Sequence, residues 1–394
     1  NNKTIRNLNV KGKKNVGLFG TSTNCTIKNL IVDGANVEGI NHVAVIAGDA
    51  LCAKIEGCTV KNAKIVARTA KNDKDEDDDG DKAAAIAGYL SAEPTAWVKD
   101  CIAENIEVTG YRDVGGIVGY ANSAAVVTGN KVNGLKLTLD NTANYKGYIT
   151  LDEHDVNPII GEYNNGTLDS SNTYENVTAI AEYSEGFNRV IGTDVYEISS
   201  ENGFEYWCDS INVTKTVYKN ATIKLTADID YTGRDFTPLH MFGGDKWQNM
   251  TIDGNGYTIK NITCGNDKSE SGSVYNLGFI SSASSSITIK NIVFDNIVMG
   301  NSNYLNMVGV VIGAAYSSVT MENVMLKNCT VNGFGKVGVL IGAMADPGKK
   351  VTIKNCSIDD SNKIIGTYDV GGLIGLYLRG ENNTEDVTIT GTKP

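Results

Sequence analysis

Two short patterns alternate along almost the whole chain, and this repetition limits its fold more than any other feature. One is T-I-x-N followed by alternating aliphatic residues, at 4–10, 26–32, 258–264, 288–294 and related segments. The other is an apolar run bounded by glycine: VGLFG (16–20), VAVIAG (43–48), AAAIAG (83–88), VGGIVG (114–119), VGVVIG (308–313), VGVLIG (337–342) and VGGLIG (370–375). Repeats of 22 to 32 residues with short β-branched runs cannot bury an apolar face alone, so they must stack on their neighbours. The pattern predicts an all-β fold, a right-handed parallel β-helix (solenoid).

The repeats also match as a block, which predicts two tandem copies. TIKNL at 26 returns as TIKNI at 288, and VGGIVG at 114 returns as VGGLIG at 370. We expect a first copy over 1–193, without an N-terminal cap, and a second over 194–394. Within the second copy, 194–250 departs from the pattern and is predicted to be a cap, followed by a β-helix over 251–394. Because Asn1 begins inside a repeat, we expect a fragment or a processed chain.

The predicted cap contains one helical segment, SSENGFEYWCDSIN at 199–212. Ser199 or Ser200 is suited to the N-cap position. The apolar residues recur at helical spacing and would share one face of the helix. Those residues are Phe204, Trp207, Cys208 and Ile211.

Asparagines at five-residue spacing flank one strand of successive repeats. Asn291 and Asn296, and then Asn323 and Asn328, show this spacing most clearly. Asparagine tolerates left-handed backbone and bonds to its own turn, and stacked amides pair with one another. We therefore interpret these residues as turns and ladders of the fold.

Cysteine usage and charge exclude several classes of protein. Of eight cysteines, Cys58, Cys101 and Cys356 occupy positions that hold aliphatic residues in other repeats, which predicts free, buried thiols. With three histidines and no C-x-x-C pair, a zinc site is not expected. The net charge of −11 without a basic stripe argues against a nucleic-acid partner. No run of 18 apolar residues exists, so no transmembrane segment is expected.

The glycine-bounded runs, especially VGLFG, VGGIVG and VGGLIG, resemble the GLUG motif. LTADIDYTG, DGNGYTIKNI and NLGFIS are similar to the opening of such units, and the resemblance covers nearly the whole chain. This motif occurs in large secreted proteins of gut bacteria and beside IgA1-protease-like metallopeptidases. The resemblance implies a β-helix on the cell surface with an adhesive or scaffold role. It supplies no catalytic residues here, because the H-E-x-x-H motif of zinc peptidases is absent.

An acidic loop, KNDKDEDDDGDK at 71–82, is the one candidate metal site. Its D-x-D-x-D-G spacing matches the start of calcium loops, in which carboxylates supply hard oxygen ligands. The candidate ligands are Asp75, Asp77, Asp79 and Asp81. The twelfth position is Ile86 instead of a bidentate glutamate, and it belongs to a core run. A solvated acidic loop without metal is the competing interpretation.

No catalytic constellation emerges from the sequence. Asp113 and Asp369 precede their VGG runs at matching positions, but they belong to different copies. Within the first copy, Asp100 and Asp113 are candidates for a carboxylate pair, although no lyase or glycosidase signature accompanies them. Exposed aromatic residues would suit glycan binding, and the candidates are Tyr89, Tyr111, Tyr120, Tyr316, Tyr377, Trp97 and Trp247.

These observations favour a non-catalytic secreted or cell-surface module for adhesion, for binding a glycan or host protein, or for spacing. One alternative is a β-helix polysaccharide lyase or glycosidase. Another is the accessory region of an IgA1-protease-like surface peptidase. An aromatic strip flanked by polar groups would indicate glycan binding, whereas carboxylates converging with a cation in a groove would indicate an enzyme. Apart from possible calcium, no cofactor is expected.

Overall fold

A computed structural model describes residues 3–68, 81–92, 95–140, 156–164, 167–242, 245–265, 276–300, 305–378 and 387–391. In these residues the chain is mostly β, with parallel sheets of many strands and one α-helix. It divides into two compact units. Unit 1 comprises Asn1–Tyr183 and Arg189–Gly192, and unit 2 comprises Ser184–Asn188 and Thr193–Pro394.

In unit 1, each strand pairs in parallel with the strand four places later. The chain therefore passes through the same four sheets in the same order, and we call one such passage a coil. Coil 1 contains β1 (Lys3–Lys11), β2 (Lys14–Val16), β3 (Phe19–Thr23) and β4 (Thr26–Lys28). Coil 2 contains β5 (Leu30–Gly39), β6 (Asn41–Ala44), β7 (Ala47–Leu51) and β8 (Lys54–Glu56). Coil 3 contains β9 (Thr59–Ala67), β10 (Asp81–Ala84), β11 (Ala87–Ala92) and β12 (Trp97–Lys99).

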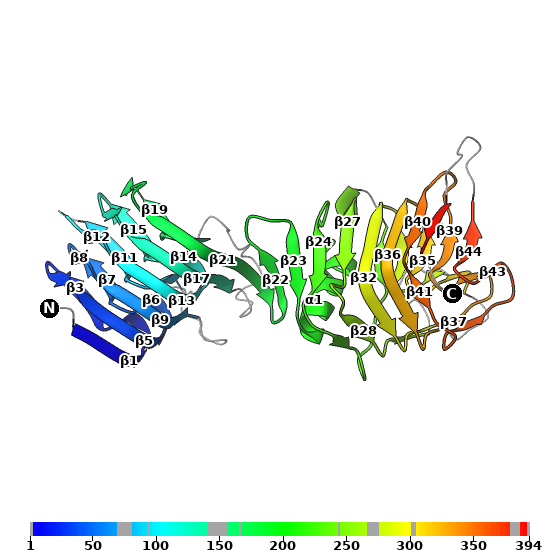
Figure 1. Cartoon of the computed structure of the whole chain (residues 1–394), viewed down its shortest axis with the longest axis horizontal. Helices are drawn as coiled ribbons and strands as arrows, with labels where there is room; N and C mark the ends of the chain where they lie inside the picture. Colours follow the sequence, from blue (N-terminus) through cyan, green and yellow to red (C-terminus); the bar gives the residue numbers. More distant parts are fainter. Residues whose placement is uncertain are drawn as a thin grey trace. The chain divides into compact units, whose positions relative to one another are not determined.

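Two further passages complete this arrangement. Coil 4 contains β13 (Ile102–Gly110), β14 (Arg112–Gly115), β15 (Val118–Ser123) and β16 (Val126–Thr128). Coil 5 contains β17 (Lys131–Asp140), β18 (Val156–Asn157), β19 (Ile160–Asn164) and β20 (Thr167–Leu168), and β21 (Thr173–Ser184) pairs with β17. In Figure 1, the long strands β5, β9, β13 and β17 lie side by side.

The core of unit 1 consists of like residues stacked between coils. Val37, Ile65, Val108 and Leu137 pair in register along the long sheet, and all four are fully buried. Because side chains alternate between the two faces of a strand, the intervening residues face solvent. Burial of such columns supplies the main driving force for stacking, at roughly 25 cal/mol per Å² of apolar surface.

Unit 2 has the same parallel pairing between coils. One sheet contains β23 (Val195–Ile198), β24 (Thr222–Leu225), β25 (Ile229–Asp230), β27 (Met250–Asp253), β28 (Thr258–Lys260), β32 (Ile287–Asp295), β36 (Val319–Lys327), β40 (Val351–Lys354), β41 (Ser357–Ile358) and β45 (Val387–Thr390). A second contains β26 (Leu239–Met241), β31 (Ile280–Ala283), β35 (Ile312–Ala315), β39 (Ile341–Met344) and β44 (Ile374–Tyr377). A third sheet contains β29 (Thr263–Cys264), β33 (Val298–Met299), β37 (Thr330–Asn332) and β42 (Lys363–Ile365). A fourth contains β30 (Asn276–Leu277), β34 (Met307–Val308), β38 (Lys336–Gly338) and β43 (Val370–Gly371).

The predicted helix is confirmed as α1 (Glu201–Asn212), between β23 and β24. The Ser200 side chain caps it by accepting a hydrogen bond from the Gly203 backbone N–H. Its apolar face buries Phe204 and Trp207, and the Phe204 ring stacks on Phe279 at a centroid distance of 6.0 Å. Parallel pairing already includes β23 and β24, so it begins within the 194–250 segment that the sequence pattern assigned to a cap.

The asparagine interpretation is also confirmed. Asn291, Asn296, Asn323 and Asn328 all have φ between 51° and 54°, in the left-handed region. The Asn323 Nδ2 donates to Asn291 Oδ1 of the preceding coil at 2.8 Å, which forms the expected ladder. These amides stabilise the corners of the fold.

All eight cysteines lie in the described residues as thiols outside disulfide bonds, and six of them, including Cys58, Cys101 and Cys356, are buried. Cys58 and Cys101 lie opposite each other on neighbouring coils, because Thr59 pairs with Ile102. Burial raises the pKa of the Cys329 thiol to about 11. The prediction of buried thiols at Cys58, Cys101 and Cys356 is therefore confirmed.

Candidate functional site

The predicted calcium ligands are not placed by the structure. Asp75, Asp77 and Asp79 lie outside the described residues, and Asp81 begins β10 without a described side chain. Among the described residues, no three histidine, cysteine or acidic side chains form a group that could hold a metal ion. The calcium loop therefore stays a prediction.

Asp100 and Asp113 do not form a carboxylate pair. They flank opposite ends of β13, a nine-residue strand that spans roughly 25 Å when extended. Asp113 instead lies 3.5 Å from the Lys82 ammonium, measured from Oδ2 to Nζ. The hypothesis that these two acids converge is wrong, because one strand of the long sheet separates them.

Most of the aromatic candidates pack within the fold. Trp247 is buried, and its indole N–H donates to the Thr216 carbonyl at 3.0 Å. Trp97 lies in β12, not in a connecting segment, and its N–H donates to Glu56 Oε1 at 2.7 Å. The Tyr377 hydroxyl donates to the Lys349 carbonyl, the Tyr316 ring contacts Phe242 edge to face, and Tyr111 is half-buried.

Tyr89 and Tyr120, by contrast, come together on one face of unit 1. They pair in register on β11 and β15, and their rings stack at a centroid distance of 5.6 Å with an interplanar angle of 2°. The His42 ring continues this stack on the other side of Tyr89, at 4.9 Å and 10°. Three aromatic rings from three successive coils therefore form one column.

The glycine-bounded runs create this arrangement. We call the residue immediately before each run the corner residue. The last glycine of a run lies against the backbone of the corner residue of the preceding coil. A Cβ at Gly88 would lie 2.7 Å from the carbonyl carbon of His42, and one at Gly119 would lie 2.7 Å from that of Lys82. Only glycine permits this approach. The residue after each glycine is thereby placed beside a corner residue of the previous coil, as Tyr89 is beside His42.

Polar and charged groups surround the ring column. The His42 Nδ1 lies 3.1 Å from Asn15 Oδ1 and 4.0 Å from Asp49 Oδ2. The Lys82 ammonium lies 5.5 Å from the centre of the Tyr120 ring. We call Asp49, His42, Tyr89, Lys82 and Tyr120 the strip. The Asn122 side chain borders it and donates to the Tyr89 hydroxyl at 3.2 Å.

Several features of the strip are unfavourable for folding. Lys82 has φ +62°, a conformation that costs about 1–2 kcal/mol for an L-residue other than glycine or asparagine. Burial raises the pKa of the Asp49 carboxyl, and no described residue forms a hydrogen bond to its buried Oδ1 atom. Local strain and incompletely paired polar groups concentrate at functional sites.

Unit 2 shows that the fold does not require these residue types. Gly313 occupies the same place in its run, and a Cβ there would lie 2.7 Å from the Leu277 backbone nitrogen. The residues that follow the matching glycines are small or aliphatic, and they are Ala314, Ala343 and Leu376. The position after the glycine therefore needs neither tyrosine nor aspartate, which marks the tyrosine pair as a specific property of unit 1.

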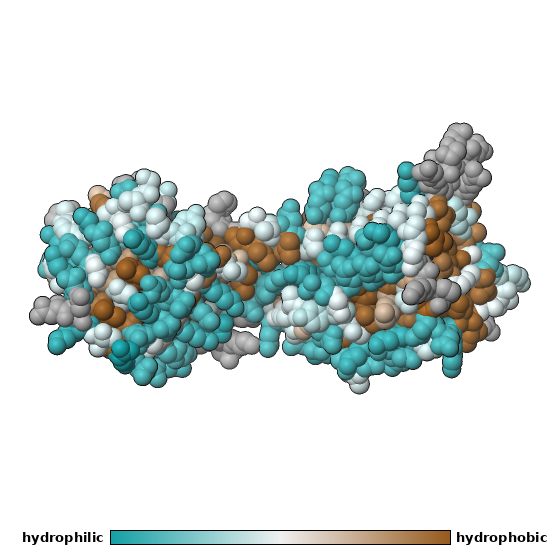
Figure 2. Space-filling view, viewed as in Figure 1, coloured by the Kyte–Doolittle hydropathy of each residue, from teal (hydrophilic) through white to brown (hydrophobic). Residues whose placement is uncertain are grey.

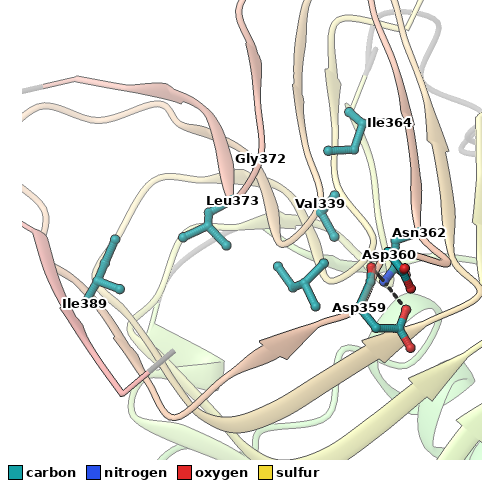
Figure 3. Close-up of a pocket in the computed structure, with 9 residues that line it drawn as sticks. Val339, Asp359, Asp360, Asn362, Ile364, Gly372, Leu373 and Ile389 are labelled. Carbon is teal, nitrogen blue, oxygen red and sulfur yellow. Dashed lines mark hydrogen bonds between the residues drawn. The ribbon is translucent and has the colours of Figure 1, made fainter. Parts of the chain in front are cut away.

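A second candidate is a hollow of about 440 Å³ in unit 2, shown in Figure 3. It is lined mainly by apolar residues, including Val339, Ile364, Leu373 and Ile389. Ile389 is 48% exposed, whereas its register partner Ile353 on the preceding coil is fully buried. The hollow is thus the uncovered end of the described core, and Figure 2 shows apolar surface gathered over these last strands.

The polar rim of this hollow has a structural explanation. Asn362 Nδ2 donates to Asp359 Oδ1 at 3.0 Å, and Asn362 Oδ1 accepts from the Cys329 backbone N–H at 3.0 Å. In unit 1, Asn172 makes the equivalent bond to the Asn130 N–H at 3.0 Å. The turn is shared by both units, so these side chains are engaged in the fold and do not define a ligand site.

Sequence reasoning identified Tyr89 and Tyr120 but missed His42 and Lys82. The available signal was their position before the glycine-bounded runs, where Met307 and Lys336 also stand and where the asparagine and aspartate residues are Asn15, Asp113 and Asp369. Asparagine and aspartate suit a left-handed corner, and all three have positive φ. Histidine occurs at this position once among these runs, at His42, and could have been noticed, whereas lysine occurs twice, at Lys82 and Lys336.

Comparisons with known proteins add little. No protein-family model matches the chain, and no curated protein matches it. Distantly similar solved structures include the catalytic domain of a GH87 α-1,3-glucanase in complex with nigerose, at 12% identity and a TM-score of 0.18. A variant of that domain, also with nigerose, gives 13% identity and 0.19. Each comparison covers 99% of this chain, which spans 64% of the length of that domain. Likeness at this level does not indicate what the chain binds.

No helix in the part of the chain that the structure describes is both long and apolar enough to cross a membrane.

Proposed function

We propose that this chain is a non-catalytic module of a secreted or cell-surface protein and that it binds glycans through unit 1. The observation that carries the proposal is the strip, a column of aromatic rings bordered by an acid, a lysine and an amide. Sugar-binding surfaces combine such apolar bodies with a few oriented polar groups. In unit 2 the matching glycines are followed by Ala314, Ala343 and Leu376 in place of tyrosine or aspartate.

The spacing of acids supports binding in preference to glycoside hydrolysis. Asp49 on β7 and Glu162 on β19 lie three strands apart, at about 14 Å for the usual strand spacing. Paired carboxylates of glycosidases are about 5–10 Å apart. The intervening acid, Asp113, lies against Lys82.

We infer further that both units are right-handed parallel β-helices. Repeated parallel pairing with a return through the same sheets supports a helical path, and parallel crossovers are right-handed in almost all proteins. We also propose membership of the GLUG group and an extracellular location. The close approach at Gly88 and Gly119 gives the motif a physical reason. Labelling of intact source cells with an antibody to this chain would test the location, and labelling only after lysis would contradict it.

A glycan array probed with the whole chain tests the function, with calcium and then with chelator. Saturable binding to a defined class of glycan is expected. The Tyr89→Ala/Tyr120→Ala double variant should lose at least about tenfold in affinity, whereas Tyr174→Ala, an exposed tyrosine outside the strip, should bind normally. A blank array would overturn the proposal. Release of new reducing ends from a bound glycan would overturn its non-catalytic part.

A further inference from the structure

We propose that the ligand of the strip is a linear, uncharged glycan that lies parallel to the stack of coils, with one sugar unit beside each coil. This inference rests on the proposed glycan-binding function and specifies the ligand class and its orientation.

The strip repeats with the period of the coils. Asp49, Tyr89, Tyr120 and Glu162 pair in register on β7, β11, β15 and β19, so the strip and its flanking acid repeat once per coil. Neighbouring strands lie about 4.8 Å apart, which is close to the length of one sugar unit in an extended chain. A linear polymer can therefore present the same hydroxyl groups to each coil in turn. A single sugar would contact only one or two of these side chains.

Stacking leaves only parts of the aromatic rings for a ligand. Because His42, Tyr89 and Tyr120 stack on one another, their faces are largely occupied and the edges and hydroxyls remain for a ligand. The Tyr89 hydroxyl accepts from Asn122 and keeps its own proton for donation. Asp49 offers acceptor oxygens. Alternating donors and acceptors suit sugar hydroxyls, which perform both roles.

The charges around the strip favour an uncharged ligand. The one lysine of the strip is paired with the Asp113 carboxylate, so its charge is largely neutralised. Asp49 faces the His42 imidazole at 4.0 Å, and Glu162 is exposed at the far end. An acidic face repels carboxylate- or sulfate-bearing polymers, since like charges brought together are unfavourable. An uncharged glycan avoids this repulsion.

Oligosaccharides of two to six units test the inference by calorimetry on the whole chain. The probes are β-1,4-linked glucose and N-acetylglucosamine series, with an oligogalacturonate series as the acidic comparison. Affinity for a neutral series should rise about fivefold to tenfold per added unit up to about four units and then level off. The acidic series should bind at least about tenfold more weakly.

Conservative variants separate recognition from folding. Tyr89→Phe and Tyr120→Phe keep the ring stack and remove one hydroxyl each, so each should lower tetramer affinity while leaving dimer affinity less affected. Tyr174→Phe is the matched control and should change neither.

The outcomes distinguish the two proposals. Neutral glycan binding without dependence on length, or tighter binding of the acidic series, would overturn the inference and leave the glycan-binding function standing. Neutral binding that both phenylalanine variants leave unchanged would also overturn it. Absence of binding to every series, together with a blank array, would overturn both.

Discussion

Corner residues in unit 1 adopt left-handed backbone whatever their chemistry. Asn15 and Asp113 are residue types that tolerate this conformation, with φ of 54° at both. Lys82 has φ +62° and also forms the ion pair with Asp113, whose side chain is only 3% exposed. The left-handed backbone of Lys82 therefore lowers the stability of the fold, whereas its ion pair with Asp113 raises it.

A double-mutant comparison separates the two effects. Lys82→Asn alone should lower the free energy of unfolding by about 1–3 kcal/mol, because it leaves the Asp113 carboxylate buried without its nearby cation. The Lys82→Asn/Asp113→Asn variant should return to within about 1 kcal/mol of the wild type, because it removes both the charge and the strained lysine. Chemical denaturation measures both values, with Lys64→Asn on an exposed, regular stretch of β9 as the control. Equal losses in the single and double variants would contradict this account.

Asp49 gives a pH-dependent prediction. Burial raises the pKa of its carboxyl in the folded protein, so its contribution to stability is present below the unfolded pKa and is lost as pH rises through the folded pKa. At neutral pH the ionised group therefore destabilises the fold. Asp49→Asn should have a higher Tm than the wild type at pH 7, and the gap should close as pH falls toward about 4.

The control for this prediction is Glu107→Gln, which alters an exposed carboxylate on β13. This variant should show no comparable gap in Tm. A constant difference between Asp49→Asn and the wild type across the pH range would show that ionisation is not the cause.

Local sequence patterns predicted helix α1 and the turns between strands. Helix α1 follows from Ser200 and the spacing of Phe204 and Trp207, and the corners follow from paired asparagines. The onset of parallel pairing in unit 2 was not predictable in the same way. Strand β23 lacks the repeat pattern, and its pairing with β24, which pairs in turn with β27, brings it into the sheet.

Core stacking in unit 2 leads to a prediction for β32. Ile292 is 1% exposed and pairs in register with Val324 of the next coil. Ile292→Ala should cost about 2–5 kcal/mol of unfolding free energy, since it removes buried methyl groups and leaves a cavity. Met325→Ala, at a position 43% exposed on β36, should cost far less. A loss below about 0.5 kcal/mol for Ile292→Ala in denaturant titrations would contradict core stacking at this position.

For the whole molecule, internal repetition predicted the parallel all-β class but not the site. Tyr89 and Tyr120 were visible as aromatic candidates in matching repeats. The contacts of these tyrosines with His42 and Lys82 could not be inferred, because each glycine places its following residue beside a corner residue one coil earlier, as Gly88 does with His42. This offset between coils is a property of three-dimensional packing and leaves no trace in residue spacing.

A calcium site in the acidic loop would make the thermal stability of the chain depend on calcium. If Asp75, Asp77 and Asp79 bind calcium, millimolar calcium should raise the Tm, because a ligand that binds only the folded state stabilises it by mass action. Asp77→Ala should abolish that rise. A scan with equal magnesium is the control, and an equal rise with both ions, or none with calcium, would contradict a calcium site.

The corner glycines separate the invariant framework of a coil from its variable surface. In each coil the apolar run and its last glycine maintain the path of the chain, while the residue after the glycine can be aspartate, tyrosine, alanine or leucine. Each coil therefore presents one variable side chain at a fixed position along the stack of coils. Insertion of a whole coil would lengthen the recognition surface by one step, and an insertion of one residue within a strand would shift the later side chains of that strand out of register.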